Sequence, residues 1–360
     1  MIEHENVRLR IGWIIGMLYL LTSLLSAQNE RYTFTDFTVK DGLSHANVLS
    51  IYEDKIGSYW VGTIDGLTRI LGNEIKNYSY HYSDSTSILS NHVQFVVEDA
   101  CGQLWVSTSH GVSKYFSNTD SFVPVFVAGN LLKAFSYQLE GQHILFGGNQ
   151  AIYSYDCSVG EIKPLLLLQS SFPLSINYFK RVDKNRFLVV DNYKGVFWVD
   201  AQTGVVTRFP TIHHKTEYNQ AFIDSESHLW LAPYTKGLEC YSLEDEGKLL
   251  HHYTTDNSLL SHNSVTDVKE FGSQLWIATD GGGINILDRK SGFFQHVTHS
   301  SFDEHSISSD FIRVLFEDSF GTKWAGTVHN GLICIHEGYM KHYSSVGNCE
   351  LKGHGYRSVS

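Results

Sequence analysis

The chain is poor in charged residues, proline and methionine. Only 18% of its 360 residues are charged, and it contains 5 prolines and 3 methionines. The 27 lysines and arginines are outnumbered by 38 aspartates and glutamates, and they form no basic cluster. Because nucleic-acid binding requires clustered lysine and arginine, this composition argues against a DNA- or RNA-binding protein.

Motifs for metal ions and cofactors are missing as well. The 5 cysteines are an odd number, and none lies in the CxxC pair of zinc and thioredoxin motifs. The 19 histidines include no HExxH spacing, and the adjacent pairs at 213–214 and 251–252 would point to opposite faces of a strand. The glycine-rich stretch 280–287 lacks the Lys and Ser/Thr of a phosphate-binding loop and predicts a turn. We therefore expect no metal site and no cofactor.

Only one long apolar run occurs, at residues 11–25. It follows Arg8 and Arg10 and precedes Ser-Ala-Gln, which is the charged, apolar and small-residue order of a secretory signal peptide. The run is short for a membrane span, which needs about 20 apolar residues. We expect residues 1–27 to form a signal peptide that is cleaved after Ala27, with an uncleaved membrane anchor as the alternative.

What the chain does contain is many aromatic residues and a tryptophan that recurs at regular spacing. Five tryptophans lie in similar phrases such as YWVGTIDGL and KWAGTVHNGL, and two weaker copies lie at 140–155 and 183–199. The seven units have a period of about 44 residues, which is typical of propellers and solenoids. The five tryptophans are Trp60, Trp105, Trp230, Trp276 and Trp324.

One unit, residues 43–82, shows what each repeat encodes. It predicts four short strands joined by turns, and no unit has the 3.6-residue apolar period of a helix. The sequence therefore predicts an all-β fold, a seven-bladed β-propeller of four-stranded antiparallel blades over residues 31–345, with an irregular tail at 346–360. The expected strands of this unit are 48–52, 59–63, 67–71 and a last strand with Ile75, Tyr78, Tyr80 and Tyr82.

The remaining blades follow at the same spacing. Blades three and four are degenerate copies that have Phe146 and Val189 near the place of the tryptophan. Cys240 and Cys334 occupy one repeat position two blades apart, so we expect small buried residues there and no disulfide between them. The second to seventh blades are predicted at 89–126, 131–168, 176–209, 218–253, 260–297 and 308–343.

Two segments compete for one place in the ring. Residues 31–39 and 340–345 both have the pattern of a fourth strand at the outer edge of a blade. A propeller closes its ring to protect its edges, so one of the two segments is expected to be displaced. A strand supplied twice also leads to the hypothesis that two copies of the chain pair as a homodimer.

Several units share a fuller pattern. The segments DGLSHANVLSIYEDKIGSYWVGTIDGLTRI, SILSNHVQFVVEDACGQLWVSTSHGVSKY and LLSHNSVTDVKEFGSQLWIATDGGGINIL share a skeleton of L-S-x-N-x-V, E-D-x-x-G-x-x-W and G-T-x-x-G-L. This skeleton resembles the two-component regulator propeller repeat, over residues 33–343. The resemblance implies the periplasmic sensor region of a hybrid two-component histidine kinase of Bacteroidetes. Many such regulators sense oligosaccharides released from glycans and control the genes for their use.

The resemblance also implies what this chain lacks. Family members usually have two propellers, a β-sandwich, a membrane helix, a kinase core and response-regulator domains. This chain has one propeller and no kinase motif, so we expect no enzymatic activity from it. It is expected to be a truncated sensor that works with a missing C-terminal sensor and kinase region, or else a stand-alone periplasmic interaction propeller. A propeller hydrolase or lyase is a further alternative.

Two conspicuous sets of residues have structural explanations. The Glu-Asp pairs at 53–54, 98–99 and 317–318 precede a glycine three residues after the aspartate, which predicts hairpin turns and not paired catalytic carboxylates. The tryptophans lie in the middle of second strands, which predicts packing between blades and not sugar stacking. We therefore expect no catalytic residues in either set.

The blade topology predicts where a ligand would bind. The loop that leads into a first strand and the turn between the second and third strands lie on the same face of a blade. Their polar side chains therefore converge at one mouth of the ring, where they suit a hydroxylated ligand such as an oligosaccharide; turn capping by Ser and Asn is the alternative. The candidate ligand-binding residues are His45, Asp65, His92, His110, Asn192, Tyr193, Tyr234, His262, Asp280, His329 and Asn330. The same loops and turns also contain Ser44, Asn47, Asn91, Asn149, Asn263 and Asp310.

Overall fold

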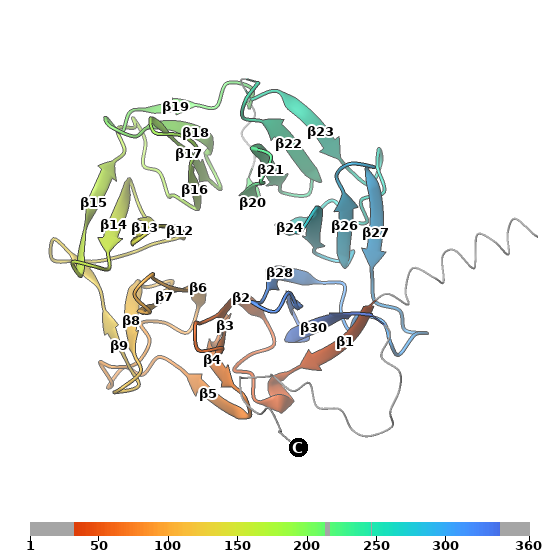
Figure 1. Ribbon diagram of the computed structural model, residues 1–360, viewed down its shortest axis with the longest axis horizontal. Coiled ribbons are helices and arrows are strands. Elements are labelled where there is room, and N and C mark those ends of the chain that lie inside the picture. The colour runs from red at the N-terminus through yellow and green to blue at the C-terminus, as the bar shows by residue number, and fades with distance from the viewer. Residues whose placement is uncertain (1–31, 213–216, 246, 339–360) are drawn as a thin grey trace, which may run out of the picture.

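The computed structural model describes residues 32–212, 217–245 and 247–338. The signal peptide predicted at 1–27, the strand predicted at 340–345 and the tail at 346–360 lie outside the described residues. Seven four-stranded antiparallel sheets surround a common axis (Figure 1), so the predicted all-β seven-bladed propeller is confirmed. Within the described residues, no helix has the length and apolar character needed to cross a membrane.

Each blade has its first strand nearest the axis and its fourth strand at the rim (Figure 1). Blade 1 contains β2 (Val48–Glu53), β3 (Tyr59–Thr63), β4 (Gly66–Leu71) and β5 (Glu74–Tyr78). Blade 2 contains β6 (Val93–Glu98), β7 (Leu104–Thr108), β8 (Val112–Phe116) and β9 (Ser121–Pro124), and a small hairpin of β10 (Phe126–Val127) and β11 (Asn130–Leu131) follows it. Blade 3 contains β12 (Ser136–Glu140), β13 (His143–Gly147), β14 (Ala151–Asp156) and β15 (Glu161–Leu167).

The second half of the ring follows the same order. Blade 4 contains β16 (Tyr178–Arg181), β17 (Arg186–Asp191), β18 (Gly195–Asp200) and β19 (Val206–Arg208). Blade 5 contains β20 (Tyr218–Ile223), β21 (His228–Pro233), β22 (Leu238–Ser242) and β23 (Leu249–Tyr253). Blade 6 contains β24 (Val265–Phe271), β25 (Gln274–Thr279), β26 (Ile284–Asp288) and β27 (Phe293–Val297). Blade 7 contains β28 (Ile312–Glu317), β29 (Lys323–Thr327) and β30 (Leu332–Glu337).

The ring closes through β1 (Tyr32–Phe37), which forms the rim strand of blade 7. It pairs antiparallel with β30, from Tyr32 opposite Glu337 to Phe37 opposite Leu332. The short 3-10 helix η1 (Val39–Asp41) then leads the chain into blade 1. Of the two segments that the sequence places at this edge, the N-terminal one therefore occupies it.

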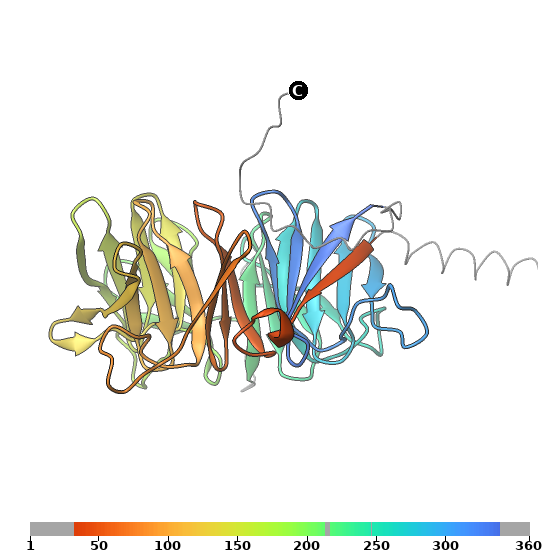
Figure 2. The same cartoon turned by 90° about the horizontal axis from the view of Figure 1, so that it is seen from below.

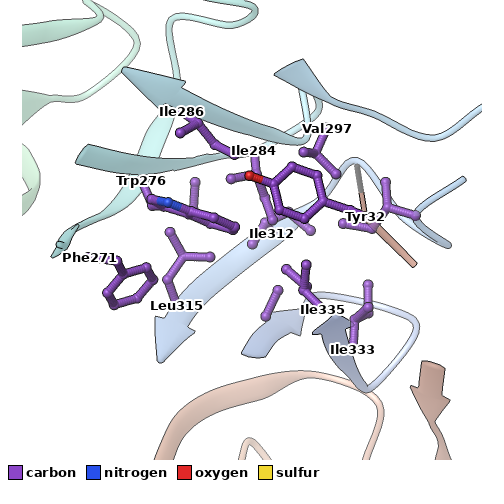
Figure 3. Packing of buried hydrophobic residues seen from close by; sticks show 13 residues of the cluster. Tyr32, Phe271, Trp276, Ile284, Ile286, Val297, Ile312, Leu315, Ile333 and Ile335 are labelled. Atoms are coloured by element: carbon purple, nitrogen blue, oxygen red, sulfur yellow. The ribbon is translucent and has the colours of Figure 1, made fainter. Parts of the chain in front are cut away.

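Tyr32 anchors β1 in the core between blades 6 and 7 (Figure 3). Its ring meets that of Trp276 edge-on, with 5.8 Å between the centroids, and both residues are buried. Edge-to-face aromatic pairs add to the stabilisation that burial of the rings provides. The rest of this cluster consists of Phe271, Ala278, Ile284, Ile286, Val297, Ile307, Ile312, Leu315, Ala325, Ile333 and Ile335.

All five repeat tryptophans are buried in the second strand of their blade, as predicted. They pack against the neighbouring blade. The ring of Trp60 lies 4.9 Å from that of Tyr115 in blade 2, and Trp105 lies 4.6 Å from Tyr155 in blade 3. The tryptophans therefore form the interfaces between blades and are not available for stacking on a ligand.

A β-bulge occurs in the first strand of the same five blades that carry the tryptophan. In blade 1 the pairing steps from Val48 opposite Thr63 to Ser50 opposite Gly62, so one residue is left over. Blades 3 and 4 pair their first two strands without such a shift. An extra residue bends a strand and increases its twist, so the tryptophan and the bulge mark one blade type. The other bulges follow Val93, Tyr218, Val265 and Ile312.

The Glu-Asp pairs form turns, as predicted. Asp54 accepts the backbone N–H of Ser58 at 2.7 Å through Oδ1 and the indole N–H of Trp60 at 2.8 Å through Oδ2. Because both carboxylate oxygens are engaged, Asp54 ties the turn to the core and has no free oxygen for acid–base chemistry. The same indole bond joins Trp105 to Asp99, Trp230 to Asp224 and Trp324 to Asp318.

One sequence prediction for blade 1 is wrong. The fourth strand β5 ends at Tyr78, so Tyr80 and Tyr82 lie in the loop to blade 2. The reason is a local competitor for the backbone, because the N–H of Tyr80 donates to the side-chain Oδ1 of Asn91 at 2.6 Å. That bond draws the chain away from the sheet and towards the next blade.

The four cysteines in the described part of the chain fall into two groups. Cys240 and Cys334 are buried and form no disulfide with each other, as predicted from their place in the repeat. Cys101 and Cys157 form a disulfide that the sequence analysis did not predict. The two residues are 56 positions apart and lie in different blades, and no repeat spacing relates them.

Candidate functional site

The structure places the leading loops and the inner turns on one face of the ring, which we call the loop face. Backbone hydrogen bonds join the turn between second and third strands of one blade to the loop that leads into the next. Gly66 donates to the carbonyl of Asn91 at 2.8 Å, and Gly331 of blade 7 donates to Ala46 of blade 1 at 2.9 Å. Equivalent bonds run from Gly237 to Asn263 and from Gly283 to Asp310. Figure 2 shows the ring edge-on, with this face on one side and the remaining turns on the other.

Two candidate histidines are turn caps. The Nδ1 atom of His45 accepts the backbone N–H of Asn47 at 2.9 Å, and His262 accepts that of Ser264 at 3.2 Å. A side chain that accepts an N–H two residues later stabilises the tight turn before the first strand. The same role is filled by serine in two other blades, where Ser90 accepts from His92 and Ser309 accepts from Phe311.

The residue that follows the turn cap holds the earlier part of the same loop, just after the fourth strand of the preceding blade. Asn91 accepts the N–H of Tyr80, and Asn263 accepts that of Thr255 at 2.9 Å. Asn91 also donates its amide to Oδ1 of the candidate Asp65 at 2.7 Å. These asparagines are structural, so the capping alternative holds for them. Asp310 accepts the N–H of His299 in the same way.

Two further candidates are also held in the scaffold. Asn330 donates its side-chain amide to the carbonyl of Ser308 at 2.9 Å, and Asn192 donates its backbone N–H to Oδ1 of Asn177 at 3.0 Å. Together with the capping histidines and Asp65, they shape the loop face. The candidates that lie exposed on this face are Asp65, His92, His110, Tyr193, Tyr234, Asp280, His329 and Asn330.

Some of the exposed candidates lie on neighbouring blades. Tyr193 and Tyr234 occupy corresponding turns of the neighbouring blades 4 and 5, and they are 71% and 54% exposed. In blades 6 and 7, His329 lies edge-on to Phe311 with 6.0 Å between ring centroids, and Asp280 forms a backbone bridge with Phe311. The loop face thus offers two exposed tyrosines on neighbouring blades and a group of one carboxylate, one imidazole and one phenyl ring.

Sequence reasoning missed several aromatic residues of the loop face. Tyr82 is 94% exposed and Phe302 is 99% exposed, each in a loop that joins a fourth strand to the next blade. Phe311 and Tyr80 are also exposed. The feature of the sequence that could have indicated them is an aromatic residue within an otherwise polar loop. A large ring exposed at the surface points to a binding surface, whereas a buried ring points only to packing.

On the opposite face, charges between blades are paired. Asp224 of blade 5 accepts Nη1 of Arg289 from blade 6 at 2.9 Å. Burial raises the pKa of Asp224, but the hydrogen bonds from Trp230 and from the backbone of His228, with the charges of His228 and Arg289, outweigh it. The pKa of Asp224 therefore lies below its ordinary value. This arrangement stabilises the ring and supplies no unpaired acid.

A cluster of potential metal ligands on that face is structural. Asp99, Cys101 and Cys157 bring one carboxylate oxygen and two sulfur atoms within 4.8 Å of one another. The sulfur atoms are bonded to each other, and Asp99 accepts the N–H groups of Cys101 and Gln103 and the indole of Trp105. The donor atoms are therefore already engaged and do not fit a metal ion.

Comparisons with known proteins support the resemblance seen in the repeat. A family model described as two component regulator propeller matches residues 42–65, in blade 1. A segment of 64 residues is 50% identical to histidine kinase P4 of Formosa agariphila, and it covers 18% of this chain and 5% of that protein. The chain therefore carries the two-component regulator propeller repeat.

Solved structures show the same architecture. The extracellular domain of a putative hybrid two component system from B. thetaiotaomicron superposes with a TM-score of 0.70 at 23% identity, covering 84% of this chain and 42% of that one. The extracellular domain of a putative one component system from the same organism gives a TM-score of 0.65 at 18% identity, covering 84% and 39%. This chain thus has the fold of these extracellular domains and spans less than half of their length.

Proposed function

We propose that this chain is the ligand-binding propeller of a hybrid two-component regulator in the periplasm, and that its loop face binds an oligosaccharide derived from a glycan. The repeat, the fold and the relation to a histidine kinase support the regulator. The observation that carries the ligand is that exposed rings, above all Tyr193 and Tyr234, and exposed polar side chains lie on the same face of the ring.

The disulfide supports a location outside the cytoplasm. Cys101 and Cys157 lie in different blades, and their bond persists only where thiols are oxidised. The similar solved structures are extracellular domains, and the apolar run at 11–25 has the pattern of an export signal. A periplasmic propeller accounts for all three observations.

The chemistry of the loop face fits a sugar. Sugar rings present apolar C–H faces that pack on exposed aromatic rings, while their hydroxyls both donate and accept hydrogen bonds. Tyr193 and Tyr234 supply two rings from neighbouring blades, and Asp280 and His329 supply an acceptor and a donor beside Phe311. Loops on a rigid scaffold commonly carry such binding groups.

Binding of the ligand would be read out by the rest of the regulator. A ligand shifts a conformational equilibrium only when it binds one arrangement better than the other. We propose that the occupied propeller favours one arrangement of a homodimer or of the adjoining sensor and kinase region. The chain itself contributes recognition and no chemical step, and transcriptional control of polysaccharide use follows from the kinase.

The test is calorimetric titration with a panel of glycan-derived oligosaccharides. We expect at least one to bind, and we expect Tyr193→Ala and Tyr234→Ala each to weaken it about tenfold or more, because a stacked ring is lost. Phe293→Ala is the matched control, since Phe293 is 52% exposed at the start of β27, on the opposite face. A ligand that binds equally well to both tyrosine variants would show that the loop face is not its site.

An interaction propeller without signal output is the second candidate. The nearly complete exposure of Tyr82 and Phe302 favours it, because such rings at loop tips also suit a protein surface. Binding of another envelope protein that is lost in the double variant Tyr82→Ala/Phe302→Ala, with no oligosaccharide bound, would favour this candidate. A propeller hydrolase would need Asp65, His110 and Asp280, and turnover that survives their joint substitution would remove that site.

A further inference from the structure

The face opposite the loop face, which we call the turn face, joins neighbouring blades by a repeated contact. The residue after the turn aspartate of one blade donates its backbone N–H to a glutamate at the end of the first strand in the next blade. Lys55 donates to Glu98 at 2.7 Å from blade 1 to blade 2, and Ser225 donates to Glu270 at 2.8 Å from blade 5 to blade 6. Ser319 of blade 7 donates to Glu53 of blade 1 at 2.6 Å. We call this contact the glutamate clamp.

The glutamate clamp cannot form between blades 2 and 3. Glu98 lies opposite Leu104 in the pairing of first and second strands, and the equivalent residue of blade 3 is Leu139, opposite Ile144. Leu139 is 49% exposed, and its side chain has no oxygen that could accept an N–H. The turn of blade 2 that would donate to it is therefore without this anchor.

A disulfide bond joins blades 2 and 3 where the glutamate clamp is missing. Cys101 belongs to the turn between β6 and β7 of blade 2, the same turn that makes the clamp in other blades. Its sulfur is bonded to Cys157, in the turn between β14 and β15 of blade 3, on the same face. The disulfide therefore links the two blades at an interface where the glutamate is missing; blades 4 and 5 have Arg181 and Ile223 at the equivalent position.

The interface between blades 2 and 3 borders the two blades that depart most from the repeat. Blade 3 and the following blade 4 lack both the second-strand tryptophan and the first-strand bulge of the other blades. Between them an ion pair of Arg181 with Glu140 at 3.1 Å spans the turn face. The disulfide thus links blade 2 to blades 3 and 4, the part of the ring whose sequence departs most from the repeat.

The disulfide is also within reach of a thiol. Cys101 is exposed and Cys157 is partly exposed, whereas Cys240 and Cys334 are buried. Thiol–disulfide exchange requires access of an attacking thiolate to one of the sulfur atoms. Reduction would therefore act on this pair while the packed ring remains in place.

We propose that Cys101–Cys157 is a redox-sensitive latch that replaces the glutamate clamp between blades 2 and 3. A thiolate of a dithiol attacks one sulfur, the S–S bond breaks, and a mixed disulfide forms with release of the other cysteine as a thiolate. The second thiol of the dithiol then displaces the remaining cysteine. The protein gains two electrons and two protons as two thiols, and the dithiol is oxidised to its disulfide. Without the latch the two turns separate, and this interface opens locally.

Hydrogen exchange measured by mass spectrometry tests the latch. The full chain, prepared without reductant, is compared before and after treatment with dithiothreitol. We expect exchange in peptides covering 99–104 and 156–161 to rise about tenfold or more, because a disulfide constrains local opening. Peptides at the glutamate clamp of Ser225 and Glu270 should keep their rate. Unchanged exchange at 99–104, or a uniform rise over the whole ring, would overturn the proposal.

A rescue variant tests whether the disulfide replaces the glutamate clamp or only stabilises the whole fold. In Cys101→Ser/Cys157→Ser we expect the fast local exchange of the reduced protein without any reductant. Adding Leu139→Glu restores the carboxylate that other blades have, and we expect it to return the 99–104 peptide towards its oxidised rate. Leu139→Gln is the matched control for side-chain length without charge and should restore less. Failure of Leu139→Glu to slow the exchange would show that the disulfide does not stand in for the clamp.

Discussion

The indole N–H of Trp105 donates a 3.0 Å hydrogen bond to the carboxylate of Asp99, six residues earlier, and both residues are buried. This bond ties the turn of a blade to its interface with the next. In blade 6 the turn between Phe271 and Gln274 is shorter and has no aspartate. Among the described residues, Nε1 of Trp276 is left buried without a hydrogen-bond partner.

The two tryptophans should therefore respond differently to the same change. Trp105→Phe removes a donor and leaves Asp99 buried without it, whereas Trp276→Phe removes a donor that has no acceptor. A buried polar group that loses its partner costs about 1–3 kcal/mol, so we expect Trp105→Phe to lower the free energy of unfolding by that much more than Trp276→Phe. Urea denaturation of the two variants measures the difference. Equal losses would contradict the role assigned to the Trp105–Asp99 bond.

Acid should destabilise the ring through Asp224. Its pKa is lower in the folded protein than the ordinary 3.8, so the unfolded chain binds a proton first as the pH falls. The stability that Asp224 contributes is present above pH 3.8 and is lost as the pH falls through its folded pKa. We expect Asp224→Asn to be less stable at neutral pH and to lose less stability on acidification. The measurement is the free energy of unfolding against pH, and parallel curves for variant and parent would refute it.

His45 should behave as a cap and not as a ligand contact. His45→Ala leaves the N–H of Asn47 without its acceptor and is expected to cost about 1 kcal/mol of unfolding free energy. His45→Ser should lose less than about half of that, because Ser90 and Ser309 make the same bond in other blades. Thermal unfolding compares the two variants. A ligand affinity that falls in His45→Ser while the stability is kept would restore His45 as a binding residue.

Removal of β1 should expose the edge of β30. A chain that lacks residues 1–37 leaves the hydrogen-bonding groups of Leu332–Glu337 unpaired, and unpaired edges promote association between chains. We expect this chain to self-associate on size-exclusion chromatography with light scattering. A peptide of residues 32–37 should restore the size of the parent, and a chain that lacks only residues 1–31 is the control. A truncated chain of unchanged size would contradict closure through β1.

The strongly patterned blades could be predicted almost in full. In blade 5 the predicted range 218–253 coincides with the strands from Tyr218 to Tyr253. Alternating apolar residues predict strands, a turn glycine predicts the turn between them, and a central tryptophan predicts the buried second strand. In these blades the three predictions agree with one another. Tyr80 shows where such reasoning fails. The alternation of Tyr78 and Tyr80 predicts a longer strand, but the strand ends at Tyr78 because the backbone N–H of Tyr80 bonds to Asn91, in the loop that leads into blade 2.

The candidate site was predictable in its place but not in the roles of its residues. Topology alone indicates that the leading loops and inner turns share a face. Whether a histidine on that face caps a turn, as His45 does, or stands exposed, as His329 does, depends on distances of about 3 Å between atoms. The exposed rings of Tyr82 and Phe302 escaped notice because a polar loop gives no periodic pattern from which exposure can be inferred.

The sequence by itself determined the repeat, the four strands of each blade and the number of blades, because these follow from local periodicity and turn chemistry. Only the tertiary structure decided which segment closes the ring and which cysteines meet. β1 pairs with β30, which lies about 300 residues later, and Cys101 bonds to Cys157 across a blade interface. Contacts of this kind depend on the curvature of the whole ring, which sums small twists over all seven blades and is not encoded in any one of them.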